Sequence, residues 1–141
     1  FVRRAVLLAM SWLVGCTTHV IDPEEGRAFA GKTVVITGAS SGIGRGTALA
    51  CARHKANVVL VARRTDLLEE VAREVRSLRG NALVMTADVG SSEQVARVAD
   101  ATVASFGRID IWINNAGVGA IGRFWDIPVA AHSRVVDVNL K

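Results

Sequence analysis

The sequence contains no tyrosine, and it has few residues of the types that build disulfide or metal frameworks. Its two cysteines, Cys16 and Cys51, are too few for a disulfide scaffold or a four-cysteine zinc site. Three histidines stand far apart, at positions 19, 54 and 132, so no metal site is expected. The missing tyrosine excludes any mechanism in which these residues supply a phenol as acid or base.

The composition is that of a folded chain with a modest positive charge. Apolar residues make up 50% and charged residues 21%, which excludes disorder, and a length of 141 residues favours one domain. Lysine and arginine number 17 against 13 acidic residues. The arginines are spread from Arg3 to Arg134 without a basic stripe and interleaved aromatics, so nucleic acid is not an expected partner.

Residues 1–21 differ from the rest of the chain. Arg3 and Arg4 precede an apolar run at 5–15, which is shorter than the roughly 20 residues that span a bilayer. A basic pair before a short apolar run is typical of a secretory signal. The run ends in Leu13-Val14-Gly15-Cys16, which resembles the lipobox of bacterial lipoproteins, where the cysteine is lipidated. The alternative is an apolar helix lying on a membrane or on the domain, followed by a linker at 22–30.

Apolar, β-branched runs alternate with stretches of helical spacing through the remaining chain. Strands are expected at 32–37, 57–62, 82–87 and 109–114. Helices are expected at 42–54, 65–80, 91–107 and from 128 toward the last residue. Thr65 is the expected N-cap of the second helix, Ser91 and Gln94 form a capping-box pattern, Gly107 closes the third helix, and Pro128 fits position N1 of the last.

Alternation of strands and helices through short connections predicts an α/β fold. The strands are apolar along their whole length, which indicates burial on both faces of a parallel sheet. We therefore expect a doubly wound, Rossmann-like sheet over residues 31–141, cut off after the fourth strand and its following helix.

A glycine-rich turn follows the first expected strand directly. Gly38, Gly42 and Gly44 surround Ser40, Ser41 and Ile43, and the last glycines open a helix. Glycine allows a tight turn and a close approach of the backbone to a ligand. The free N–H groups at the start of that helix favour a pyrophosphate, so this turn predicts a dinucleotide site.

The second expected strand ends in Arg63 and Arg64, with no acidic residue at its tip. An acid there would hold the ribose hydroxyls of NAD, whereas a nearby arginine accommodates the 2′-phosphate of NADP. Because a guanidinium suits a phosphate monoester, the sequence favours NADP over NAD. The alternative is two solvated loop arginines, with Asp66 as the ribose partner.

Four motifs together resemble those of the short-chain dehydrogenase/reductase family. They are Thr37-Gly-Ala-Ser-Ser-Gly-Ile-Gly44, Asp88-Val89, Asn114-Asn-Ala-Gly117 and Val138-Asn139, and the match runs from about residue 31 to the end. The resemblance implies that Asp88 and Val89 contact the adenine. It also implies that Asn115, Ala116 and Gly117 line the adenosine side, and that Asn139 belongs to the catalytic set and helps to hold a water in a proton relay.

The family also uses a serine and a Tyr-x-x-x-Lys pair, in which the lysine lowers the tyrosine pKa. Lys141 cannot be that lysine, because Asp137 stands four residues before it. Four strands of the order 3-2-1-4-5-6 leave the apolar strand at 109–114 on an unpaired edge. We therefore expect the N-terminal part of a longer protein, inactive and poorly soluble alone.

Three functional hypotheses follow. The first is an NADP(H)-dependent oxidoreductase that moves a hydride between nicotinamide and a carbonyl or secondary alcohol, with this chain as its cofactor-binding part. The second is a non-catalytic dinucleotide-binding protein. The third is a membrane-attached lipoprotein with a remodelled domain. The first implies a small-molecule substrate, homo-oligomers of the complete protein and a cytoplasmic location with membrane contact through residues 1–21; the third implies export.

Overall fold

The computed structural model describes residues 27–140, which form a single alternation of strands and helices. The order is β1 (Thr33–Thr37), α3 (Gly42–Arg53), β2 (Asn57–Ala62), α4 (Thr65–Ser77), β3 (Asn81–Thr86), α5 (Ser92–Phe106), β4 (Ile111–Ile113), the short 3-10 helix η2 (Phe124–Asp126) and α6 (Val129–Asn139). The segment 1–21 with Cys16, and the linker up to residue 26, lie outside the described residues. No helix within 27–140 is long and apolar enough to cross a membrane.

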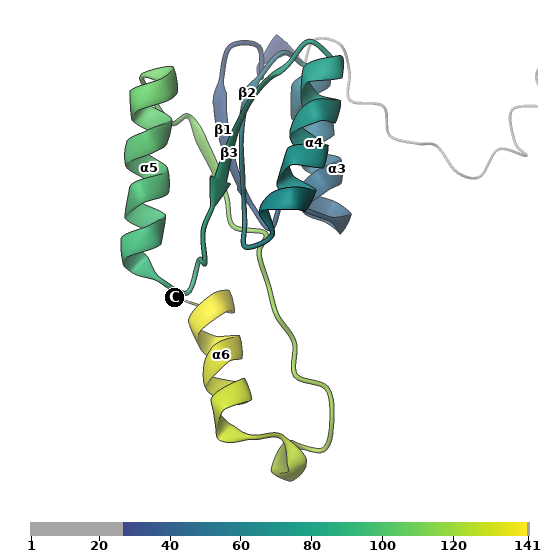
Figure 1. The fold of residues 1–141 in the computed structure, drawn as a ribbon, viewed down its shortest axis with the longest axis vertical. Helices are drawn as coiled ribbons and strands as arrows, with labels where there is room; N and C mark the ends of the chain where they lie inside the picture. The colour runs from purple at the N-terminus through teal and green to yellow at the C-terminus, as the bar shows by residue number, and fades with distance from the viewer. Residues whose placement is uncertain (1–26, 141) are drawn as a thin grey trace, which may run out of the picture.

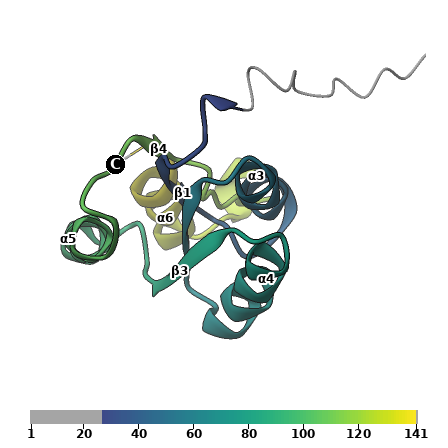
Figure 2. The same cartoon turned by 90° about the horizontal axis from the view of Figure 1, so that it is seen from above.

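The four strands form one parallel sheet in the order β3-β2-β1-β4. Helices α3 and α4 cover one face, and α5 covers the other (Figures 1 and 2). Figure 1 shows α6 beyond the carboxyl ends of the strands, apart from these layers. This arrangement confirms the predicted doubly wound α/β fold, with β4 at one edge of the described sheet.

The core lies on both sides of β1 and β2, and alternate residues of each strand face opposite ways. Val34, Ile36, Val58 and Leu60 pack with the helices α3 and α4. Val35, Val59 and Val61 instead pack on the side of α5, in a cluster that includes Val98 of that helix. Every residue of β1 is buried, which explains why its sequence is an unbroken apolar and threonine run.

Several element ends differ from the sequence prediction. Thr65 is the first residue of α4 rather than its N-cap, because its hydroxyl pairs with that of Thr86 at 2.7 Å. Pro128 takes the N-cap position of α6, one residue before N1. The fourth strand has only three residues, and the third runs from Asn81 to Thr86.

The ends of α5 follow the sequence prediction more closely. The Ser91 hydroxyl accepts a hydrogen bond from the backbone N–H of Gln94, and Gly107 ends the helix in the left-handed backbone conformation. Only half of the capping box forms, because the Gln94 side chain accepts from the backbone N–H of Asp88 at 2.9 Å rather than from that of Ser91. The helix start is thereby tied to the loop after β3.

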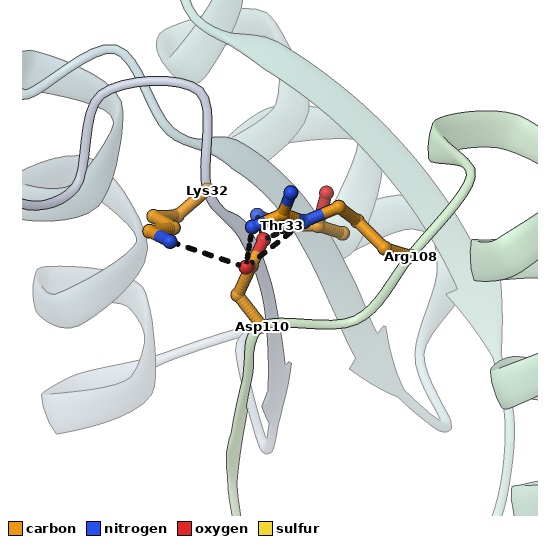
Figure 3. Close-up of polar contacts among 4 residues, drawn as sticks. All are labelled: Lys32, Thr33, Arg108 and Asp110. Carbon is orange, nitrogen blue, oxygen red and sulfur yellow. Dashed lines mark hydrogen bonds and ion pairs between the residues drawn. The ribbon is translucent and has the colours of Figure 1, made fainter.

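Asp110 joins the amino ends of β1 and β4 (Figure 3). Its carboxylate accepts from the backbone N–H of Thr33 at 2.8 Å, from Lys32 Nζ at 3.4 Å and from the Arg108 guanidinium. The Arg108 hydrogen bond is the largest cause that lowers the pKa of Asp110, followed by the Thr33 amide. The side chain is 12% exposed, and the Asp110 backbone N–H also donates to the Thr33 carbonyl at 3.0 Å, so Asp110 binds Thr33 through both its backbone and its carboxylate.

Thr37 joins the carboxyl ends of the same two strands. Its hydroxyl donates to the Ile113 carbonyl at 3.3 Å and accepts from the backbone N–H groups of Asn115 and Ala116, each at 3.0 Å. The Asn115 side chain completes the connection by donating to the Thr37 carbonyl at 3.0 Å. One buried hydroxyl therefore satisfies two backbone donors that have left the sheet ladder.

The Asp110 contacts predict a pH-dependent loss of stability in Asp110→Asn. Because the folded chain lowers the pKa of Asp110, its ionised form stabilises the fold above the ordinary aspartate pKa of about 3.9. That contribution disappears as the pH falls below this value. Urea unfolding should therefore show a lower midpoint for Asp110→Asn at pH 7 and a narrowing difference in acid. Asp100→Asn, at an exposed site on α5, is the control, and equal midpoints for the two variants at pH 7 would contradict this role.

The Thr37 contacts predict a large effect of removing a single oxygen. Thr37→Val keeps the side-chain shape but leaves two backbone N–H groups without an acceptor, which should lower the free energy of unfolding by about 2–4 kcal/mol. Thr37→Ser retains the hydroxyl and should lose about 1 kcal/mol with its methyl group. Chemical denaturation of both variants checks this, and equal stability of valine and serine would refute it.

Candidate functional site

A cleft of about 370 Å³ opens at the carboxyl end of the sheet. In the order β3-β2-β1-β4, the direction in which strands are added reverses between β1 and β4. The cleft lies at this point, which is where open parallel sheets bind ligands. Most of the predicted binding residues line it: Gly38, Ser40, Ser41, Ile43, Arg63, Arg64, Asp88, Val89, Asn115, Ala116 and Gly117. Gly42 and Gly44 do not line it.

Gly44 and Gly38 let two backbone segments approach each other under the cleft. A Cβ on Gly44 would overlap the Gly38 carbonyl oxygen and lie 2.5 Å from Asn115 Nδ2. A Cβ on Gly38, whose φ is +68°, would lie 2.8 Å from Ala116 Cα. These two glycines therefore allow the turn to pack against the segment after β4. From the sequence alone, only a tight turn and ligand binding were predicted for them.

The start of α3 presents unpaired backbone donors to the cleft. Ser41 is its N-cap residue, in an extended conformation, and its side chain makes no capping hydrogen bond. The first turn contains no acidic residue, so its N–H groups and the helix dipole favour an anion. The Ile43 side chain lines the cleft and is 81% exposed, which offers an apolar surface beside this anion site.

Arg63 and Arg64 lie at the tip of β2, and both are exposed along the cleft. Among the described residues that line it, Asp88 is the only acidic one. Asp66, the alternative ribose partner, stands in the first turn of α4 and does not line the cleft. The end of β2 therefore contributes two cationic side chains and no carboxylate to the cleft; the acidic lining residue, Asp88, comes from the loop after β3.

Asp88 follows β3, and its carboxylate is held by its own loop and by α6. Its Oδ1 accepts from the backbone N–H of Gly90 at 2.9 Å, and its Oδ2 accepts from the Arg134 guanidinium of α6 at 2.5 Å. The Gly90 hydrogen bond is the largest cause that lowers the pKa of Asp88, and Arg134 and Arg63 lower it further against an opposing effect of burial. The carboxylate is thus ionised at neutral pH.

Asn139 lies at the end of α6, beside a smaller cavity of about 220 Å³ that also contacts Thr37 and Trp112. Its Oδ1 accepts from the Val118 N–H at 3.0 Å, and its Nδ2 donates to the Val118 carbonyl at 3.0 Å. The side chain therefore connects the end of α6 to the segment after β4. It does not line the larger cleft.

Sequence reasoning missed two residues at this site. Thr37 was part of the glycine motif but was not assigned a role, although a threonine at a strand end before a glycine is a signal for a side-chain hydrogen bond. Arg134 lines the cleft and pairs with Asp88 across a separation of 46 residues. No local pattern marks it, because helical spacing alone does not say which loop an arginine meets.

Comparisons with known proteins agree with this geometry. A sequence profile described as short chain dehydrogenase matches residues 32–141. The chain is 42% identical over 108 residues to the uncharacterized oxidoreductase YxnA of Bacillus subtilis, a match that covers 77% of this chain and 30% of that protein. This chain therefore spans less than a third of the curated relative.

Solved structures show the same arrangement of elements. A metagenomic short-chain oxidoreductase in complex with NADP matches with a TM-score of 0.75 at 37% identity, over 79% of this chain and 51% of that one. An NAD+-bound xylitol dehydrogenase matches with a TM-score of 0.76 at 35% identity, over 79% and 44%. With the profile matched from β1 to the last residue and the fold shared, this chain belongs to the short-chain dehydrogenase family.

Proposed function

We propose that this chain is the cofactor-binding part of an NADP(H)-dependent oxidoreductase. The reaction is the transfer of a hydride between nicotinamide and a carbonyl or secondary alcohol. The observation that carries the NADP preference is the pair Arg63 and Arg64, which lines the cleft at the tip of β2, where the strand end itself supplies no acidic residue. Two bound relatives, one with NADP and one with NAD+, support a nicotinamide dinucleotide as the class of ligand.

The residues of the cleft fit the parts of such a cofactor. The uncapped start of α3 suits the pyrophosphate, with Ser40, Ser41 and Ile43 lining the cleft and Gly42 as the first residue of the helix. The guanidinium groups of Arg63 and Arg64 suit the 2′-phosphate. Asp88 and Val89 suit the adenine, and the backbone from Asn115 to Gly117 suits the adenosine side. When bound, the cofactor supplies the hydride, and the protein positions it.

Asn139 is the one residue of this chain that we assign to the catalytic set. Its bonds to Val118 hold α6 against the segment after β4, so we propose that it positions a proton-relay water at that junction. The 141 residues contain no tyrosine, so the tyrosine that this family uses as acid or base is not among them. A non-catalytic dinucleotide-binding protein on the same fold is the second candidate.

The other parts of the proposal concern the complete protein. We propose a small carbonyl or alcohol substrate, homo-oligomeric assembly and a cytoplasmic location, where NADPH is available. Contact of residues 1–21 with a membrane stays a prediction, as does lipidation of Cys16 in an exported form. Labelling of Cys16 with a fatty-acid probe would favour the exported lipoprotein.

Removing either arginine should change cofactor preference. Isothermal titration should show tighter binding of NADP+ than of NAD+ by the wild-type chain. Arg63→Ser and Arg64→Ser should each weaken NADP+ binding roughly ten- to a hundredfold, since a charge-assisted hydrogen bond to phosphate contributes about 1.5–3 kcal/mol, and leave NAD+ binding nearly unchanged. Arg97→Ser on α5, which pairs with Glu93 outside the cleft, is the control. Equal or tighter binding of NAD+ by the wild type would contradict the preference.

The proposal also predicts that the 141 residues bind cofactor without turnover. Incubated with NADPH and small aldehydes or ketones, they should show no loss of nicotinamide absorbance, because no phenol is present to supply the proton. Reading the coding sequence past Lys141 separates the two candidates. A serine followed by Tyr-x-x-x-Lys supports the oxidoreductase, whereas a stop codon leaves the non-catalytic binder.

A further inference from the structure

Arg134 and Asp88 form an ion pair across the mouth of the cleft. Arg134 belongs to α6, Asp88 follows β3, and both side chains line the cleft. Their closest atoms are 2.5 Å apart, and their side chains are 37% and 30% exposed. Partial shielding from water makes this pair stronger than a fully solvated one.

The pair leaves Asp88 able to accept a further hydrogen bond. An ionised carboxylate offers about four lone-pair positions. Gly90 and Arg134 occupy one position on each oxygen, and the Asp88 backbone N–H is taken by Gln94. The remaining positions are available to a donor in the cleft, and the exocyclic amino group of adenine is such a donor.

The same pair helps to place α6. No residue of this helix is fully buried, so polar contacts contribute to its placement. Two of them are the Arg134–Asp88 pair near its middle and the Asn139–Val118 bonds at its end. Loss of the first would remove the ion pair that joins the middle of the helix to the loop after β3.

We propose that Arg134 is a positioning residue for the adenine end of the cofactor. Its guanidinium holds the Asp88 carboxylate in the orientation that receives the adenine amino group, and it draws α6 over that end of the cleft. The inference rests on the proposed dinucleotide function. Because NAD and NADP share the adenine, Arg134 acts on both alike, unlike Arg63 and Arg64.

Gly90 provides a second way to disturb the pair without changing any charge. A Cβ at Gly90 would lie 2.8 Å from an Arg134 guanidinium nitrogen and 3.3 Å from Asp88 Oδ1. The guanidinium is the flexible end of a long side chain, so Gly90→Ala displaces it at little cost to the fold. The variant therefore tests the orientation of Arg134 rather than its presence.

The binding experiment titrates the 141-residue chain with NADP+ and with NAD+. Arg134→Gln and Gly90→Ala should each weaken both dinucleotides by a similar factor, roughly three- to tenfold for loss of an oriented charge-assisted bond. Gly90→Ala should add little in the Arg134→Gln background, because the group that it displaces is gone. Arg134→Lys should recover part of the affinity, and Arg97→Gln should match the wild type.

A carboxyl NMR titration of Asp88 reports on the ion pair independently of any cofactor. The groups that face this carboxylate are Arg134 from α6, Arg63 after β2 and the Gly90 amide, with Gln94 of α5 on the Asp88 backbone N–H. Arg134→Gln should raise the pKa of Asp88, while the Gly90 amide and Arg63 keep it below its ordinary value.

Each outcome decides a different step. An unchanged pKa of Asp88 in Arg134→Gln overturns the ion pair, and a raised pKa with unchanged affinity overturns the positioning role. Weakening of NADP+ alone also overturns it, in favour of a direct phosphate contact. If the wild type binds neither dinucleotide, the proposed function and the role of Arg134 within it both fail. A raised Asp88 pKa in Arg134→Gln would then show that the ion pair exists and that the failure lies with the cofactor.

Discussion

The close approach of the turn after β1 to the segment after β4 is the contact on which the cleft depends. Gly38 and Gly44 have no side chain in the space where Asn115 and Ala116 lie. Thr37 and Asn115 exchange hydrogen bonds across the same gap, although they are 78 residues apart in sequence. These contacts start α3 at the strand end, so its unpaired N–H groups face the ligand space instead of a neighbouring side chain.

Charge is distributed unevenly around that space. Arg63, Arg64 and Arg134 line the cleft, and Asp88 is the only acidic residue among its described lining residues. A carboxylate held by a backbone amide and flanked by guanidinium groups stays ionised and keeps its acceptor capacity. The excess positive charge suits phosphate groups. The preference for anions at the carboxyl end of the sheet thus comes from where these arginines lie, and not from the net charge of +4 alone.

The bounds of a strand were predicted correctly where burial on both faces determines the whole strand. They were predicted less well at β4, where side chains take part in the hydrogen bonding at both strand ends. The strand at 57–62 was predicted with its observed bounds, because an apolar run buried on both faces has clear ends. The strand predicted at 109–114 is shorter, since β4 pairs with β1 only from Val34 to Ile36. Next to these residues, the Asp110 carboxylate accepts from the Thr33 N–H beside a backbone hydrogen bond from the Asp110 N–H to the Thr33 carbonyl, and the Asn115 N–H donates to the Thr37 hydroxyl. Periodicity cannot tell a backbone partner from a side-chain partner.

Local pattern was sufficient for the alternation of strands and helices, the glycine turn and the arginines at the tip of β2, because each depends on residues close together in the chain. The family motifs placed Asp88 and the segment 115–117 at the site, but not their partners. The pairing of Arg134 with Asp88, the hydroxyl of Thr37 beneath the cleft and the packing role of Gly44 arise from the folded sheet. They join residues that are distant in sequence, and their meeting depends on strand order and helix placement, which no short stretch of sequence encodes.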